Sequence, residues 1–168
     1  MDAAVAWFEP AATDDSRGGW PGLDDGWLGD GSARWLDGGV AEATDEERSA
    51  LALDPGACVL RARWLQQRGG RPLALIRRSL PPPGGAPVLA PAVARLMLTH
   101  AGPPAARSLQ RASATTADAD EAALLRLRRG APLLVLRQCR YGVDGRPIEV
   151  RAAFWRAESA TVLMELRR

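Results

Sequence analysis

The sequence has no lysine and only one histidine, and both absences limit the chemistry that it can carry. All 22 basic residues are arginines against 20 acidic residues, and the net charge of +2 gives no sign of a nucleic-acid-binding patch. His100 falls at the expected end of a helix, which does not favour a catalytic or metal-binding role. Side chains at metal-ligand spacing are missing as well. We therefore predict no metal and no cofactor.

Cysteines and long apolar runs are also scarce. Cys58 and Cys139 both fall on expected strands, where we expect them to pack as small apolar groups in a reducing cytosol rather than to form a disulfide. No apolar run approaches the ~20 residues of a membrane-spanning helix. The N-terminus has Asp2 and no basic segment of the kind that begins a signal peptide. These absences predict a cytoplasmic protein that does not contact the membrane.

The overall composition is that of a globular protein. A chain of 168 residues with 25% charged and 46% hydrophobic residues predicts one domain with a substantial core. Residues 1–32 differ from the rest, because they are rich in Gly, Asp and Pro, which predicts an irregular arm. The arm also holds half of the six tryptophans, which argues against disorder. It either packs its aromatic side chains on the body of the protein or serves as a lid or a partner-docking segment.

The clearest pattern is a unit of helix, turn, strand, hairpin and strand over 116–156. Asp118 and Glu121 have the spacing of a helix-capping box, and Gly130 stands where a glycine that ends a helix is expected. The unit continues with an apolar strand over 133–141, an Asp-Gly turn at 144–145 and a return strand over 147–156.

The same order of elements occurs earlier, over 44–79. Thr44 and Glu47 form a second capping-box pair, and Asp54-Pro55-Gly56 is expected to end that helix. A strand over 58–67, a Gly-Gly turn at 69–70 and a return strand over 72–78 follow. Two copies, each too small to bury its own apolar face, predict one domain with an internal two-fold repeat. We also expect an edge strand near 40–41, a helix over 91–102 and a strand over 105–115.

The second unit contains DADEAALL, GAPLLVL, Tyr141 and DGRPIE, followed by Phe154-Trp155-Arg156. In these segments the chain resembles the UTRA domain, the effector-binding domain of GntR-type bacterial transcriptional regulators of the HutC branch. The resemblance covers roughly residues 33–168. It implies a fold similar to that of chorismate lyase, an α+β structure in which an antiparallel sheet is flanked by helices and a ligand pocket lies between two halves. It also implies a small-molecule effector and a homodimer.

Regulators of this family carry a winged-helix DNA-binding domain before the sensor domain. No segment of this sequence combines the basic residues and the recognition helix that DNA binding requires. We therefore expect either a stand-alone sensor domain or a degenerate relative of a regulator. In both cases we expect no direct binding to DNA, and any action on DNA would go through a DNA-binding partner protein.

Strand alternation separates the side chains of the first hairpin into two faces. Trp64 and Gln66 share the apolar face, which we expect to point inward. Arg61 and Arg63 share the other face and are expected to face solvent.

The resemblance and this alternation give seven candidate ligand-binding residues: Trp64, Gln66, Ile76, Gln138, Glu149, Arg151 and Trp155. Sugar-phosphate sensors of the family have arginines at the positions of Trp64 and Gln66 and a glutamate at that of Ile76. Because a buried phosphate needs paired cations or donors, we predict that a phosphosugar is not the effector. The site would instead suit a flat, largely apolar ligand with one cationic or hydrogen-bonding group. The alternative is that Trp64 and Trp155 fill the space as core.

Three functions agree with these patterns. The first is a sensor domain in transcriptional control, and the second is a dimerisation module without a ligand. The third is an enzyme similar to chorismate lyase, which would need an arginine near Ala62 and a glutamate near Ala152. Glu149 and Arg151 lie close by, but neither required group is in place. We therefore predict no catalytic residues and no enzymatic activity.

Overall fold

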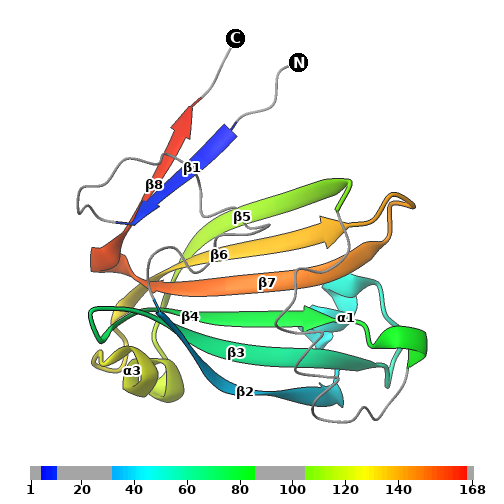
Figure 1. Cartoon of the computed structure of the whole chain (residues 1–168), viewed down its shortest axis with the longest axis horizontal. Helices are drawn as coiled ribbons and strands as arrows, with labels where there is room; N and C mark the ends of the chain where they lie inside the picture. Colours follow the sequence, from blue (N-terminus) through cyan, green and yellow to red (C-terminus); the bar gives the residue numbers. More distant parts are fainter. Residues whose placement is uncertain (1–4, 11–31, 86–104, 166–168) are drawn as a thin grey trace.

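The computed structural model describes residues 5–10, 32–85 and 105–165, and its main feature is a six-stranded antiparallel sheet (Figure 1). The strand order is β2-β3-β4-β7-β6-β5. The strands are β2 (Ser32–Glu42), β3 (Cys58–Arg68), β4 (Arg71–Leu80), β5 (Arg107–Thr116), β6 (Pro132–Tyr141) and β7 (Pro147–Arg156). The predicted α+β class with an antiparallel sheet is confirmed, and β2 lies at a sheet edge as expected.

Two short helices, α1 (Asp45–Leu51) and α3 (Ala119–Leu125), begin at the predicted capping boxes. The N–H of Glu47 donates to Thr44 Oγ1 at 3.2 Å, and the N–H of Thr44 donates to the Glu47 carboxylate at 2.8 Å. Asp118 and Glu121 make the same exchange at 2.8 and 3.1 Å. Each box satisfies two N–H groups that the helix itself leaves unpaired, so both predicted helix starts are confirmed.

Both helices end earlier than the sequence predicts. Ala52 and Arg126 follow α1 and α3 directly and have left-handed conformations, with φ of 51° and 53°. Gly56 and Gly130, the predicted helix ends, instead have positive φ in the turns before β3 and β6. The predicted positions of the helix ends are therefore wrong. The backbone N–H of each capping residue donates to a carbonyl of its own helix, and this hydrogen bond offsets the steric cost of the left-handed conformation for a residue other than glycine.

Tight turns join the two central hairpins as predicted. Gly69 and Gly70 have φ of 55° and 75°, the type I′ pattern, between β3 and β4. Between β6 and β7, Gly145 has φ of 76° and the N–H of Gly142 donates to the carbonyl of Arg146 at 2.9 Å. Single 3₁₀ turns follow β4 and β7, at η1 (Pro83–Gly85) and η2 (Ala157–Ser159). The two units share one order of elements, and a two-fold relation between them remains a prediction.

A second, two-stranded sheet brings the two ends of the chain together, apart from the main sheet (Figure 1). It pairs β1 (Val5–Pro10) with β8 (Ala160–Glu165). This strand corrects the prediction that residues 1–32 form an irregular arm. Pairing with β8 satisfies the backbone N–H and C=O groups that point towards it, and the sequence VAWFE contains residue types that favour strands. The other residues expected in the arm before Ser32, the helix over 91–102 and His100 lie outside the described residues.

The two described helices lie on one face of the main sheet. Leu125 of α3 packs there in a cluster with Leu75 and Phe154, and Leu51 of α1 packs against Val59. The opposite face has apolar clusters of its own, which include Ala62, Ile76 and Trp155 among their buried members. Side chains of the central strands are therefore buried on both faces, and the face opposite the helices carries the candidate site.

Candidate functional site

All seven candidate residues lie on the sheet face opposite the helices. Ile76 pairs with Trp64 on one side and with Ala153 on the other. Two residues along, Arg151 pairs with both Arg78 and Gln138. Alternate residues of a strand share a face, so these pairs fix the side on which the whole set lies. Strand alternation placed Trp64 and Gln66 on this face, and the strand pairing agrees.

The apolar part of the face centres on two tryptophans. Trp155 and Ile76 are each 5% exposed, and they pack in one cluster with Ala153 and Trp64. Trp35 of β2 meets Trp64 edge to face, with ring centres 5.4 Å apart and the planes at 90°. This is a favourable geometry for two aromatic rings. The same contacts also suit the alternative interpretation, in which Trp64 and Trp155 are core residues.

The charged part of the face centres on Glu149. Arg78 Nε donates to Glu149 Oε1 at 2.5 Å, and Arg140 Nη1 donates to Oε2 at 2.8 Å. Arg151 donates to both oxygens, through Nε and Nη2. The side chains of these four residues are 10% exposed or less. One carboxylate is thus held by three arginines in the interior of the protein.

These hydrogen bonds determine the ionisation state of Glu149 and limit the contacts that it can make with a ligand. Burial raises the pKa of Glu149, but the hydrogen bonds and charges of Arg151 and Arg78 outweigh burial and lower that pKa below its ordinary value. The carboxylate is therefore ionised, and four hydrogen bonds occupy its acceptor positions. It is not placed to bind a cationic group of a ligand or to act as a general acid. Of the two kinds of ligand group that the sequence suggested, this geometry favours a hydrogen-bonding group over a cationic one at Glu149, and the ligand chemistry stays a prediction.

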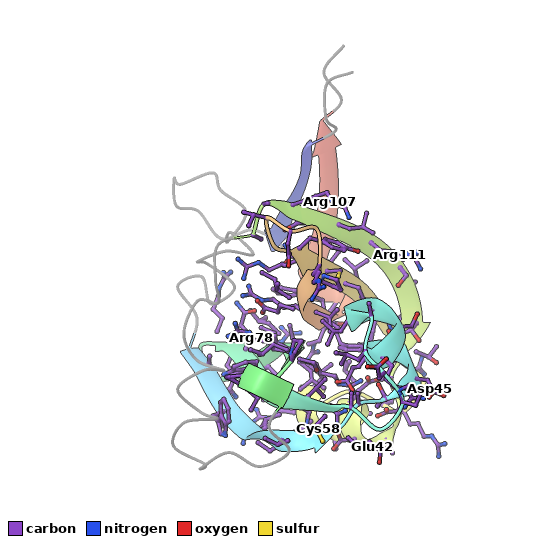
Figure 2. The ribbon with its side chains drawn as sticks, turned by 90° about the vertical axis from the view of Figure 1, so that its right-hand side faces the viewer. Glu42, Asp45, Cys58, Arg78, Arg107 and Arg111 are labelled. Carbon is purple, nitrogen blue, oxygen red and sulfur yellow. The ribbon has the colours of Figure 1, made fainter. Side chains whose placement is uncertain are left out.

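Arg78 and Arg140 belong to this site, and sequence reasoning missed both. They are buried, at 5% and 3% exposed. In Figure 2, Arg78 lies among the side chains inside the fold, whereas Arg107 and Arg111 lie along the edge strand β5. The available signal was strand parity, because Arg78 stands two residues after Ile76 and Arg140 two residues after Gln138.

Arg61 and Arg63 lie on the helix face, opposite Trp64 as predicted, but they do not face free solvent. Arg61 Nε donates to Glu47 of α1 at 2.8 Å. Arg63 donates to Asp37 of β2 at 3.0 Å and to Asp120 of α3 at 2.6 Å. Their side chains are about one third exposed, at 31% and 30%. The expectation of solvent-facing arginines holds only in part, because acidic side chains of α1, α3 and β2 pair with both groups while about a third of each side chain stays exposed.

Two buried amides complete the site. Gln66 and Gln138 are 5% and 3% exposed, and the side-chain oxygen of each accepts no hydrogen bond from the described part of the chain. Rotating either amide by 180° exchanges its oxygen for its NH₂ group. Each amide can therefore accept from a ligand or donate to it.

Other chemistry finds little support in the described residues. Cys58 and Cys139 are free thiols, and the thiol of Cys139 donates to the carbonyl of Ala50 at 3.5 Å. Over the described ranges, no group of three or more His, Cys, Asp or Glu side chains is placed to hold a metal ion. Of the described helices, none is long and apolar enough to cross a bilayer.

Comparison with known proteins supports the resemblance noted in the sequence. The UTRA domain family model matches residues 30–161. The fold is similar to the ligand-binding domain assigned to a GntR-family transcriptional regulator of Bordetella bronchiseptica, with a TM-score of 0.73 and 20% identity over 95% of this chain and 96% of that one. A protein assigned as a transcriptional regulator of Streptomyces coelicolor aligns at a TM-score of 0.68 and 23% identity, over 99% and 100% of the two chains.

A third solved structure is the effector domain of PhnF from Mycobacterium smegmatis. It aligns at a TM-score of 0.58 and 24% identity, over 76% of this chain and 81% of that one. A comparison with functionally curated proteins gives no match.

Proposed function

The chain belongs to the UTRA domain family, and on that premise we propose that it is a small-molecule sensor domain in transcriptional control. Its effector would bind on the sheet face that carries Glu149, Arg151 and Trp155. The observation that supports this most directly is the buried cluster of Glu149 and three arginines on that face. Arg78 comes from the first unit, and Arg140 and Arg151 come from the second. A ligand at this junction would contact both units and could favour one arrangement of the domain.

The sequence argument against a phosphosugar, that the site lacks cations for a phosphate, does not hold beside Arg78, Arg140 and Arg151. The remaining argument against a phosphosugar is the apolar part of the same face. Sugar hydroxyls placed beside Ile76, Ala153 and Trp155 would lose their bonds to water without gaining partners there. The effector we propose has a largely apolar body.

An enzymatic role is less well supported. Chorismate lyase-like chemistry needs a carboxylate that can take part in the reaction, and the only carboxylate that the described residues bring to the three arginines is Glu149. A depressed pKa makes this group a weak base, and its oxygens are already hydrogen bonded. We propose that the chain is not an enzyme.

Native mass spectrometry of the gently purified protein tests the proposal, because it reports bound molecules and oligomeric state together. We expect a homodimer that carries a small added mass, and release of that mass on denaturation should identify the effector. A dimer with no added mass, whose melting temperature no metabolite fraction raises, would favour a dimerisation module without a ligand. A monomer would contradict the predicted homodimer.

A further inference from the structure

The edge strand β5 pairs with β6 alone in the described part of the main sheet. Its ten residues run from Arg107 to Thr116, and all of them are exposed except Ser113, which is half-buried. The strand contains no proline, and its register with β6 has no shift. An antiparallel edge strand directs about half of its N–H and C=O groups away from its neighbour. β5 therefore presents a regular row of backbone groups to which another strand can bind.

The opposite edge strand, β2, is less suited to such pairing. Its register with β3 shifts between Trp35 and Asp37, and Gly38 and Gly39 follow the shift. Bulges and glycines bend or weaken a strand and so discourage a further strand from pairing with it. β5 has neither, and it exposes Leu109 to 55%. Among the strand side chains that the structure describes, Leu109 is the large apolar one that is exposed.

A row of arginines crosses the helix face of the sheet and ends on β5. Strand pairing sets its members in the order Arg63, Arg77, Ala152, Arg137 and Arg111. Each of the three inner arginines pairs with a carboxylate of a neighbouring element: Arg63 with Asp37 of β2 and Asp120 of α3, Arg77 with Glu121 of α3, and Arg137 with Glu46 of α1.

The arginines of β5 differ from these three. Arg111, at the outer end of the row, is exposed and forms no ion pair with a described residue. Arg107 lies on the same face of β5, 4.1 Å over the ring of Tyr141, and pairs with no carboxylate of the described residues (Figure 2). The pattern of the row indicates that an element beyond β5 supplies carboxylates to these two arginines.

The charge of β5 distinguishes between two kinds of partner strand. Its sequence, RSLQRASATT, contains two arginines and no acidic residue. If β5 paired with β5 of a second copy, four arginines would meet and neither strand would supply a carboxylate. A strand with acidic side chains would pair with both arginines, and repulsion between like charges would exclude a basic strand.

We infer that the free edge of β5 binds an extended, acidic segment of a partner protein, which adds one strand to the six of the main sheet. Backbone hydrogen bonds would supply much of the affinity, and the side chains would supply the specificity. Arg107, Leu109 and Arg111 alternate along one face of β5, so the segment has two acidic residues four positions apart with an apolar residue midway between them. The inference does not depend on the proposed effector.

Fluorescence anisotropy of two labelled peptides tests the inference with the full chain at constant, low ionic strength. The acidic peptide is TETVTET in one-letter code, which places its glutamates opposite Arg107 and Arg111 and its valine opposite Leu109. Its sequence is palindromic, so it suits β5 in either direction. The basic peptide TKTVTKT is the matched control. We expect the acidic peptide to bind and the basic peptide to bind roughly tenfold more weakly or less, and added salt should weaken the binding of the acidic peptide.

A double charge reversal assigns the binding to β5. Arg107→Glu combined with Arg111→Glu should reverse the preference, so that the basic peptide binds roughly tenfold more tightly than the acidic one. Both side chains are exposed, so this variant should fold, and circular dichroism checks that it does. The matched control is Arg34→Glu, which reverses the charge of an exposed arginine on the other edge strand, β2, and should leave the preference unchanged.

Hydrogen exchange of the β5 amides shows whether the backbone takes part. In the free protein, the amides of β5 that point away from β6 should exchange fast, and the acidic peptide should slow their exchange. A peptide that is bound through its charges alone would leave these amides unprotected.

Several outcomes would overturn the inference. Binding of neither peptide would do so, as would binding without protection of β5 or a preference that the double reversal leaves unchanged. Protection of β5 in the free protein that grows with protein concentration would assign the edge to a second copy and would overturn the acidic partner as well. The sensor function is decided separately by native mass spectrometry, because that experiment detects a retained small molecule whatever binds to β5.

Discussion

At the residue scale, Glu149 is the side chain of the candidate site on which the buried charges depend most. It is 2% exposed and accepts hydrogen bonds from three arginines that come from three different strands. A buried charge is tolerated when it is paired and becomes costly when its partner is removed. Glu149 therefore allows the three arginines to remain inside the protein.

This role predicts a large loss of stability on Glu149→Gln. The neutral amide leaves three buried arginines without their shared counter-charge, so we expect the free energy of unfolding to fall by about 3–5 kcal/mol. Urea unfolding followed by circular dichroism measures the change. Glu158→Gln is the matched control, since Glu158 pairs with Arg71 and Arg156 but its side chain is 55% exposed. The control should change stability much less, and similar losses in both variants would contradict the role of Glu149.

A second side chain, Glu47, makes the stability of the protein depend on pH. Burial raises its pKa, but hydrogen bonds from Arg61 and Ser79 outweigh burial and lower the pKa from 4.5 to about 2. The native state therefore binds fewer protons than the unfolded state over this range. The stabilisation by ionised Glu47 is fully present above pH 4.5 and is lost as the pH falls towards 2.

Glu47→Gln tests this dependence while it keeps a residue type that suits the capping box. We expect the stability of the native sequence to fall more steeply than that of the variant between pH 4.5 and about 2, the range bounded by the two pKa values. Urea midpoints measured at several pH values give the two slopes. Parallel slopes would show that the titration of Glu47 does not contribute.

At the element scale, α1 and α3 are capped in the same way at both ends. Each begins with a capping box and ends at a non-glycine residue in the left-handed conformation. Helices of seven residues are marginal in isolation, so caps and packing decide whether they form. Acidic side chains of the first turns of both helices then pair with arginines of the sheet, as Arg61 does with Glu47 and Arg77 with Glu121.

The left-handed cap predicts that Ala52→Gly stabilises the protein. Ala52 is exposed with φ of 51°, and glycine adopts this conformation without the steric cost of an L-residue, for a gain of up to about 1 kcal/mol. Thermal unfolding should show a higher midpoint. Ala50→Gly is the control within the helix, where the same change should destabilise by about 1 kcal/mol. A loss of stability in both variants would mean that the cap does not favour glycine.

At the scale of the whole molecule, one strand pairing joins the two units of the main sheet. β4 and β7 pair from Ala74–Trp155 to Ser79–Val150, and the Arg78–Glu149 bond crosses the same junction. Ala153 is 2% exposed and lies between Ile76 and Leu136, near the middle of the sheet. The two units should therefore unfold together.

Ala153→Leu tests this cooperation. Extra volume at the junction should overpack it and cost about 1–3 kcal/mol. Hydrogen exchange should then show the same loss of protection for the slowest amides of β3 and of β6, because both exchange through global unfolding. Ala112→Leu is the matched control, since Ala112 pairs with Leu136 in the same row but is exposed on the edge strand β5. A loss confined to one unit would show that the two units open separately.

The local elements of this protein follow from short-range patterns in its sequence. Capping boxes at Thr44 and Asp118, paired glycines in one turn and Asp-Gly in another, and period-two alternation all act over a few residues, so the helix starts, the hairpins and the face of Trp64 could be predicted. The motifs around Gly130 and Glu149 also indicated the family. Helix ends were displaced by four residues, because local bonding allowed Ala52 and Arg126 to adopt a conformation that the sequence would assign to glycine.

Which side chains meet across the sheet depends on long-range strand pairing. Arg78, Arg140 and Glu149 lie on three strands, and 71 residues separate Arg78 from Glu149 in the chain. Their convergence depends on the pairing and register of β4, β7 and β6, which strand alternation alone does not specify. Whether an arginine faces solvent depends in the same way on what covers its face, as Arg61 and Arg63 show. Local patterns fix the direction of a side chain, and long-range packing fixes its partners and its charge environment.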